Sequence, residues 1–283
     1  MAIPEWLFGP AGDLRPLPSP EMDVVNTVQR FGGIHNAING SRTVDVLGHR
    51  SNYEFELKQL TPDEYYWLEA LYTETIPGPF KLIDPLRKNL LSREAALAKP
   101  SDATQRGLYT LGTSTLGWLQ MQDSPVTWQR RGASWTNLQD NSFVRFDRGA
   151  LVPPPPDGQM TFSVYLQAQS EISVAPSIDT FTEGVETDGV DGTAITLPVG
   201  EWYRLEFPFQ APTGTTGVSP VLWITSEPAA GEFIRIIAPQ LEYGTSATDA
   251  SIGGGSATVV IDTMDTTSPY FPYQNVSLKL LEV

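Results

Sequence analysis

The chain has 283 residues, a formal net charge of -15 and no cysteine. This length is typical of about two domains, each able to bury a core of its own. The absence of cysteine excludes disulfides, thiolate metal sites and a cysteine nucleophile. With 18 Lys+Arg against 33 Asp+Glu, the composition argues against DNA or RNA as a main ligand, because phosphate binding needs a concentrated basic surface.

The first twenty residues carry prolines at positions 4, 10, 16, 18 and 20, which predicts an extended arm rather than a helix. The arm has no basic region followed by a long apolar core, and no apolar run approaches the roughly 18 residues needed to span a bilayer. We therefore expect no membrane insertion, and synthesis and folding in a cytoplasm.

Strand signals follow the arm. A Val-rich run covers residues 22–31, and residues 43–47 and 53–57 alternate apolar and polar side chains as half-buried strands do, with glycine-containing turns between them. His35 and His49 are the two histidines, and neither belongs to a metal-binding or catalytic array. Ordinary turn or surface positions are expected for both.

A helix is predicted to begin after Thr61. Thr61 is suited to the N-cap, Pro62 to the first helical position, and Glu64 completes a capping box. An apolar face with helical spacing follows at Tyr65, Leu68, Leu71 and Tyr72. Prolines at 77 and 79 end the helix, and residues 80–85 read as a short strand that ends at a turn.

These strings also carry a family resemblance. Residues 31–57, FGGIHNAINGSRTVDVLGHRSNYEFEL, followed by LTPDEYYWLEALY and PGPFKLIDPLRKNLLS, resemble the N-terminal region of minor tail proteins from phages of actinobacteria, which are similar to the distal tail protein. The resemblance covers roughly the first hundred residues. It implies a β-rich domain with one helix laid against it, several copies of which close a ring at the tip of a tail tube.

The composition of the chain changes at 93–106, where a polar stretch follows the apolar pattern, and we interpret this segment as the end of the first part of the first domain. Short apolar segments then follow without helical periodicity, as in an all-β sandwich. The expected strands lie at 115–119, 126–129, 142–146, 160–168, 171–175, 194–197, 202–209, 221–226 and 233–241. The strings NSFVRFD, MTFSVYLQA, GEWYRLEFPFQAP and IIAPQLEYGTSATDASIGG resemble the galactose-binding-like jelly rolls of carbohydrate-binding modules, which implies carbohydrate binding as a class.

Residues 253–256, GGGS, are predicted to be a flexible hinge. Strands are expected again at 257–262 and 275–283, and the last of them needs a sheet to join, which the N-terminal domain offers. The predicted fold is mainly β: residues 1–107 form the first part of a distal-tail-like domain with one helix, 108–252 an inserted β-sandwich (jelly roll), and 253–283 the returning strands that complete the first domain.

The acidic run 183–192 has two interpretations. It gathers carboxylates that suit a structural Ca²⁺, but it lacks the EF-hand spacing, which favours a solvated loop. Paired carboxylates for glycoside hydrolysis are available in any acidic chain, and no nucleophile elbow, P-loop or dinucleotide fingerprint is present. We expect no catalytic residues, no metal ligands and no cofactor, with the Ca²⁺ site as the alternative.

Tryptophans are the stronger signal for ligand binding, because sugar rings stack on aromatic planes while polar side chains bond their hydroxyls. Trp202 and Trp223 lie in strongly apolar strands and are expected in the core. Trp128 and Trp135 flank a polar turn that contains Arg130 and Arg131, so these four residues form the predicted carbohydrate-binding site. A packing role for the two tryptophans is the alternative.

The resemblance thus implies a structural subunit of a phage tail tip, located in the virion and assembled in the host cytoplasm. Its expected partners are further copies of itself in a ring, most simply a hexamer, the tail tube and other tail-tip proteins, and a host surface glycan. The alternative is a glycan-active enzyme, either a tail depolymerase or a free-standing hydrolase with a binding module.

Overall fold

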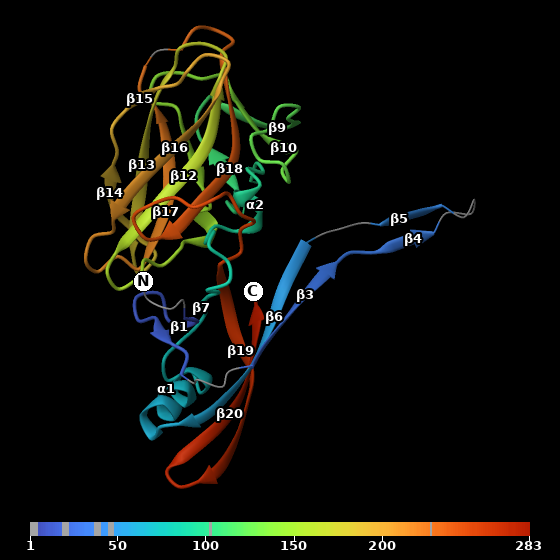
Figure 1. Cartoon of the computed structure of the whole chain (residues 1–283), viewed down its shortest axis with the longest axis vertical. Helices are drawn as coiled ribbons and strands as arrows, with labels where there is room; N and C mark the ends of the chain where they lie inside the picture. Colours follow the sequence, from blue (N-terminus) through green and yellow to red (C-terminus); the bar gives the residue numbers. More distant parts are fainter. Residues whose placement is uncertain (1–4, 19–22, 37–40, 45–47, 102–103, 227) are drawn as a thin grey trace. The chain divides into compact units, whose positions relative to one another are not determined.

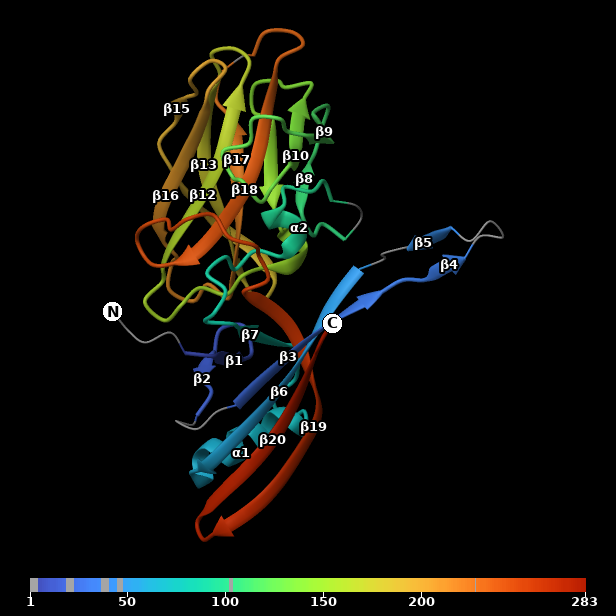
Figure 2. The same ribbon diagram turned by 45° about the vertical axis from the view of Figure 1, so that its right-hand side comes forward.

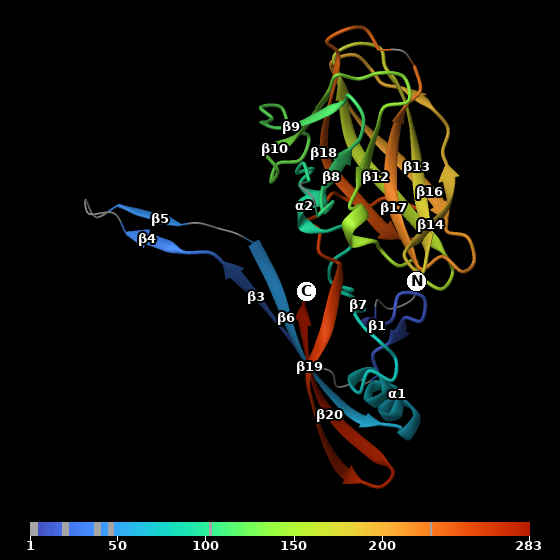
Figure 3. The same ribbon diagram turned by 180° about the vertical axis from the view of Figure 1, so that it is seen from behind.

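The computed structural model describes residues 5–18, 23–36, 41–44, 48–101, 104–226 and 228–283. The protein is mainly β, with 53% of residues in strands and 7% helical, which confirms the fold class expected from the sequence. No helix in the described part is long and apolar enough to cross a membrane. The chain divides into two compact units, which Figure 1, Figure 2 and Figure 3 show from three sides.

Unit 1 consists mainly of Ile83–Ala257, and unit 2 of Leu7–Pro10, Arg15–Leu82 and Thr258–Val283. These bounds differ from the sequence-based ones at 107 and 252. The first difference has a physical reason, because Asn89 is buried within unit 1. Its side-chain Nδ2 donates to the carbonyl oxygens of Pro239 and Ser251, both at 3.0 Å, so the segment before residue 107 is fastened to the second half of the chain.

Unit 2 contains a seven-stranded sheet in the order β2-β1-β7-β19-β20-β6-β3. The strands are β1 (Leu7–Gly9), β2 (Arg15–Pro16), β3 (Asp23–Phe31), β6 (Gly48–Leu60), β7 (Phe80–Ile83), β19 (Ser256–Tyr270) and β20 (Tyr273–Glu282). A small hairpin of β4 (Ile34–Asn36) and β5 (Arg42–Val44) extends from β3, and residues 45–47 of a predicted strand lie outside the described residues. The C-terminal strand pairs with β6, from Leu281 opposite Asn52 to Gln274 opposite Leu60.

Helix α1 (Pro62–Tyr72) begins as the sequence predicts. Thr61 is the N-cap, and its backbone N–H donates to Glu64 Oε2 at 2.7 Å in a complete capping box. The buried face differs from the expected one, because Trp67 joins Leu68 and Leu71 in the core while Tyr72 is exposed. Trp67 meets the ring of Phe8 edge-on at 6.1 Å, and this contact with a distant part of the chain decides which side of the helix is buried.

Unit 1 is a β-sandwich. One sheet has five strands in the order β16-β12-β18-β10-β9, and the other has β14-β13-β17-β11-β8 with β15 paired to β13. The strands are β8 (Leu108–Thr110), β9 (Thr115–Gln120), β10 (Arg131–Thr136), β11 (Phe143–Phe146), β12 (Gln159–Ala168), β13 (Ser173–Thr182), β14 (Val185–Asp191), β15 (Ile195–Thr196), β16 (Trp202–Gln210), β17 (Gly217–Ile224) and β18 (Phe233–Tyr243). The short helices are α2 (Arg93–Ala96) and the 3₁₀ turn η1 (Arg148–Ala150).

Two secondary-structure predictions in unit 1 were wrong, one of a strand and one of a loop. Residues 126–129 form a loop, whereas β10, which was not predicted, follows directly after them. The acidic run expected to be a solvated loop is largely strand β14, which pairs with β13. Charged and glycine-rich residues disfavour strands in isolation, but an edge position lets β14 keep its carboxylates in water while its backbone bonds to a neighbour.

The predicted hinge at 253–256 is also wrong, because its glycines are tightly packed. A Cβ on Gly253 would lie 2.4 Å from the carbonyl oxygen of Leu91, and one on Gly255 would lie 2.5 Å from that of Arg87. The backbone N–H of Gly255 donates to Asn89 O at 3.0 Å. Glycine is required here for close approach of two backbone segments, so residues 253–255 are packed within unit 1.

Candidate functional site: a polar cleft on the sandwich

Strand β12 separates two environments. Its apolar residues Met160, Phe162, Val164 and Leu166 are fully buried in the sandwich core, and the polar residues Thr161, Ser163 and Gln167 alternate with them. Because side chains alternate across a strand, the polar set belongs to the outer face of the five-stranded sheet. A polar outer face would normally be wet, yet these residues are buried as well.

Two segments cover part of this outer face. In the loop between β9 and β10, Met121 and Val126 pack against Ile237 of β18, with Trp202 of β16 partly buried beside them. The second segment follows β18 and is held by buried Glu242, which accepts hydrogen bonds from the backbone N–H and the hydroxyl of Thr248, both at 2.7 Å. The covering segments leave one end of the face open.

The open end is a cleft of about 260 Å³. It is lined by Gln167, Ala168, Gln169, Gly200, Phe233 and Arg235. Strand register puts Ser134, Arg235, Gln167 and Trp202 in one row across β10, β18, β12 and β16, since Arg235 pairs with both Ser134 and Gln167 and the latter also pairs with Trp202. Four strands that are distant in sequence therefore supply one row of side chains.

Gln167 organises the polar groups of the cleft. Its Oε1 accepts a hydrogen bond from Arg235 Nη1 at 2.9 Å, and its Nε2 donates to Gly200 O at 2.9 Å and to Asp123 Oδ2 at 3.2 Å. The guanidinium and the Asp123 carboxylate approach to 3.9 Å, and the guanidinium carbon lies 5.4 Å from the centroid of the Phe233 ring. Both ends of the buried amide are satisfied, so Gln167 positions a cation and an anion side by side.

This arrangement suits a polyhydroxylated ligand. Arg235 offers donors and Asp123 offers acceptors, and adjacent hydroxyl groups can use both at once. Within the described part of the chain, the guanidinium forms no hydrogen bond besides that of Nη1 to Gln167, while its side chain is 36% exposed. Because the carboxylate balances the guanidinium charge, the cleft favours a neutral ligand over an anionic one.

The predicted site residues lie elsewhere. Trp135 is 0% exposed, so its proposed role as an exposed platform was wrong, since it faces the core near the end of β10. Trp128 is 41% exposed, and its Nε1 donates to Ala250 O at 3.3 Å. Arg130 is exposed, and the Arg131 guanidinium lies 4.8 Å from the ring centroid of Trp118 on the neighbouring edge strand. None of the four lines the cleft.

The sequence contained a signal for the cleft residues. The string MTFSVYLQA alternates large apolar and polar side chains, and a glutamine near the end of such a strand is a candidate for the outer face. Arg235 likewise lies between Ile234 and Ile236, so alternation also places it on the outer face. Alternation does not say that Gln167 and Arg235 are neighbours, because that depends on the pairing of β12 with β18.

The two tryptophans that were expected in the core are less buried than predicted. Trp202 and Trp223 are each partly buried. Trp202 packs at the covering loop described above, and Trp223 lies 4.8 Å from Phe143, measured between ring centroids, on the six-stranded sheet. Neither is a fully buried residue, so alanine at position 202 is expected to cost less than the 3 to 5 kcal/mol of an emptied aromatic site.

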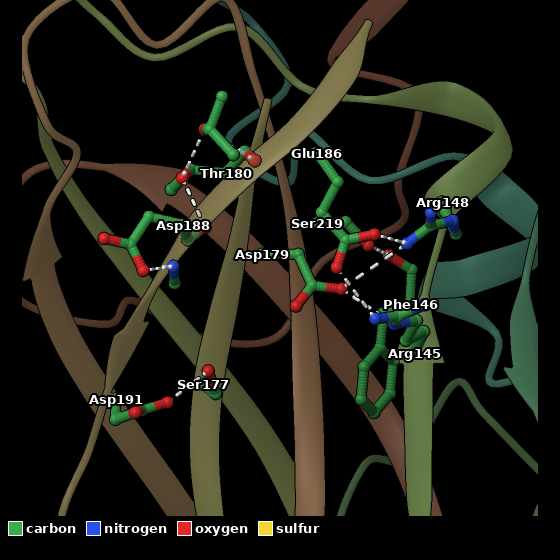
Figure 4. A network of polar contacts seen from close by, with 12 residues as sticks. Arg145, Phe146, Arg148, Ser177, Asp179, Thr180, Glu186, Asp188, Asp191 and Ser219 are labelled. Atoms are coloured by element: carbon green, nitrogen blue, oxygen red, sulfur yellow. Dashed lines mark hydrogen bonds and ion pairs between the residues drawn. The ribbon is translucent and has the colours of Figure 1, made fainter. Parts of the chain in front are cut away.

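The six-stranded sheet carries a second polar cluster, shown in Figure 4. Arg145 Nε lies 2.7 Å from Asp179 Oδ2, and Arg148 Nη1 lies 2.7 Å from Glu186 Oε2. Cross pairs complete a network of two cations and two carboxylates, with Arg145 to Glu186 at 3.1 Å. The charges balance, so the cluster is read as a clamp that joins β11, η1, β13 and β14.

Asp191 on the same acidic run accepts a hydrogen bond from the hydroxyl of Ser177 at 2.7 Å, also drawn in Figure 4. Among the described residues, no group of three or more His, Asp or Glu side chains is placed to hold a metal ion. The carboxylates of this run are instead spread along β14, at Glu186, Asp188 and Asp191. The Ca²⁺ alternative for this run stays a prediction.

The contribution of this clamp to the free energy of unfolding should depend on pH. Burial raises the pKa of Asp179 above its ordinary value of 3.8, although Arg145 and Arg148 oppose the shift. A raised folded-state pKa means that the stability from this group is present below pH 3.8 and is lost as pH rises through the folded-state pKa. The free energy of unfolding of the native protein minus that of the Asp179→Asn variant should therefore decrease as the pH rises from 3.8 through the folded-state pKa of Asp179. Denaturant titrations at a series of pH values measure it, and an increase would show that the ion pairs dominate over burial.

The comparisons with known proteins add a fold-level likeness. No family model and no curated protein matches the chain. Among solved structures it is similar to the CBM22-1 xylan-binding domain from Paenibacillus barcinonensis Xyn10C, with a TM-score of 0.40 and 10% identity over 56% of this chain and 94% of that one. It is also similar to the CBM22-1-GH10 modules of a Clostridium thermocellum endo-1,4-beta-D-xylanase, with a TM-score of 0.41 and 12% identity over 57% of this chain and 28% of that one.

A third similar structure is the enzymatically active domain of tailspike protein 4 of bacteriophage CBA120, with a TM-score of 0.39 and 12% identity over 55% of this chain and 21% of that one. The chain thus spans about a fifth of the tailspike and just over a quarter of the xylanase. At these scores and identities the likeness carries no argument about function.

Proposed function

We propose that the sandwich binds a neutral host-surface glycan in the Gln167–Arg235 cleft, and that the whole chain is a structural subunit of a phage tail tip that presents this sandwich for host adsorption. The observation that carries the binding role is the convergence of Arg235, Asp123 and Phe233 around a buried, fully bonded Gln167. Such a site combines an aromatic ring with positioned donors and acceptors, as sugar sites do.

The tail-tip role rests on the sequence resemblance of the first hundred or so residues to minor tail proteins. In this role, copies of the chain form a closed ring, most simply a hexamer, that contacts the tail tube and other tail-tip proteins in the virion. Native mass spectrometry of the purified chain and reconstruction of tail tips test it. A chain that stays monomeric in solution and in the particle contradicts the ring.

The proposed role is binding without hydrolysis. Glycoside hydrolysis uses two carboxyl groups on either side of the scissile bond. Asp123, a carboxylate that lies beside the cleft without lining it, is engaged by Gln167 and faces Arg235 instead. A reducing-sugar assay on host cell-wall polysaccharide tests this part of the proposal, and release of sugar by the purified chain would support the alternative of a glycan-active enzyme.

The cleft is tested by Arg235→Ala. Loss of a charged hydrogen-bonding group costs about 1.5 to 3 kcal/mol, so the affinity of one sandwich for its glycan should fall by about 10- to 100-fold. Glycan arrays find the ligand, and calorimetry on the intact assembly measures the affinity, because several weak sites act together when they are linked.

Arg130→Ala is the matched control, since Arg130 is an exposed arginine outside the cleft. It should leave binding unchanged. Trp128→Ala separates this cleft from the site predicted from the sequence: if Trp128→Ala abolishes binding and Arg235→Ala does not, the cleft is not the site. Thermal unfolding of each variant shows whether the sandwich is intact.

A further inference from the structure

Strand β3 is an open edge of the unit 2 sheet. All nine of its residues pair with β6 on one side, and in the described part of the chain no strand pairs with the other side. Val25, Val28 and Phe31 are 54%, 43% and 45% exposed. A long edge strand with exposed apolar side chains is a template for pairing with another chain, and proteins normally cover such an edge or place charges on it.

The charge around this edge is opposite to that of the protein. Residues 23–52, which include β3 and the hairpin beyond it, contain Arg30, Arg42 and Arg50 against Asp23 and Asp45, a net charge of +1 in a chain of net charge -15. Arg30 and Arg42 are exposed. An acidic edge strand would be attracted to Arg30, whereas a second β3 edge paired in parallel would place like charges side by side.

Strand β14 has the complementary properties. It is the terminal strand of its sheet and pairs only with β13 in the described part of the chain. Residues 183–191 hold four acidic side chains and no Lys or Arg, and Val185 is 67% exposed. Two β14 edges repel one another by the same argument.

The remaining terminal strands are poorer partners. Strands β2 and β8 have two and three residues. Strand β16 contains Pro208, which lacks a backbone N–H, and β9 continues into the loop that ends at Arg130 and Arg131, of the same sign as β3. Only β14 is long, acidic and partly apolar among the edges that the structure describes.

We propose that β3 of one copy of the chain pairs edge to edge with β14 of a second copy. Backbone groups of both edges gain partners, and Arg30 lies near the carboxylates of β14. The two surfaces differ, so the contact is head-to-tail and leaves each end of a dimer with one unused edge. Such a contact propagates until it closes into a ring or extends into a filament. It depends on neither the glycan nor the tail.

Charge reversal in the full-length chain tests the pairing by sedimentation velocity. Arg30→Glu and Asp188→Lys should each weaken self-association by at least about tenfold, because each places like charges across the contact. Combining the two reversals in one chain should restore association. Higher salt should weaken the native assembly, since the charges are at the surface.

Lys88→Glu and Glu171→Lys are matched controls, because both residues are exposed and lie on neither strand. They should leave association unchanged, and circular dichroism should show every variant folded. The proposal is overturned if the native chain is monomeric at all concentrations, if Arg30→Glu disrupts association while Asp188→Lys does not, or if the combined variant stays dissociated. A filament in place of a ring would satisfy the pairing and contradict only the ring of the proposed tail role.

Discussion

Replacing Trp135 with alanine is expected to lower the free energy of unfolding of unit 1 by about 3 to 5 kcal/mol. Trp135 is fully buried and lies in β10, opposite Ile234 of β18 on one side and Leu116 of β9 on the other. Alanine would remove an entire indole from the core, and close-packed neighbours collapse only partly into such a space. Urea unfolding followed by circular dichroism measures the change.

Trp128→Ala is the control for this substitution. The same side chain is removed, but Trp128 is 41% exposed and sits in a loop, so the change should be about 1 kcal/mol or less. The sequence-based interpretation treated the two tryptophans as equivalent platforms. Equal stability of the two variants would contradict the burial of Trp135, and the unit 1 transition has to be resolved from that of unit 2 for the comparison.

Removing residues 258–283 is expected to unfold unit 2 completely. These residues form nearly all of β19 and β20, which stand between β7 and β6 in the sheet. Val259, Val276, Leu278 and Leu280 are buried there. Without the two strands, β6 loses its pairing with β20 and the apolar side chains of the sheet are exposed to water.

Scanning calorimetry and limited proteolysis measure this deletion. The transition of unit 1 should remain, while unit 2 becomes protease-sensitive. Phe271→Ser is the control, because Phe271 is 95% exposed at the turn between β19 and β20 and its replacement should leave both transitions in place. A truncated chain in which residues 23–82 stay protected would show that the sheet does not need its C-terminal strands.

Local signals explain which parts were predictable. The start of α1 depends on Thr61, Pro62 and Glu64, which touch one another within a single turn, so the sequence alone determined it. The mainly β class and the strands at 160–168 and 202–209 follow from side-chain alternation in the same way, since alternation is a property of consecutive residues.

Only the tertiary structure decided the rest, because the deciding contacts join distant residues. Whether a tryptophan is a platform or core depends on which strands flank it, and β10 places Trp135 between β9 and β18. The glycine-rich composition around Gly255 predicted a flexible segment, but in the fold the carbonyl oxygens of Arg87 and Asn89 pack closely against Gly255. The cleft joins Asp123, Gln167 and Arg235 from a loop and two strands. No short-range pattern encodes their meeting, because it depends on strand pairing and on a loop folding over a sheet face.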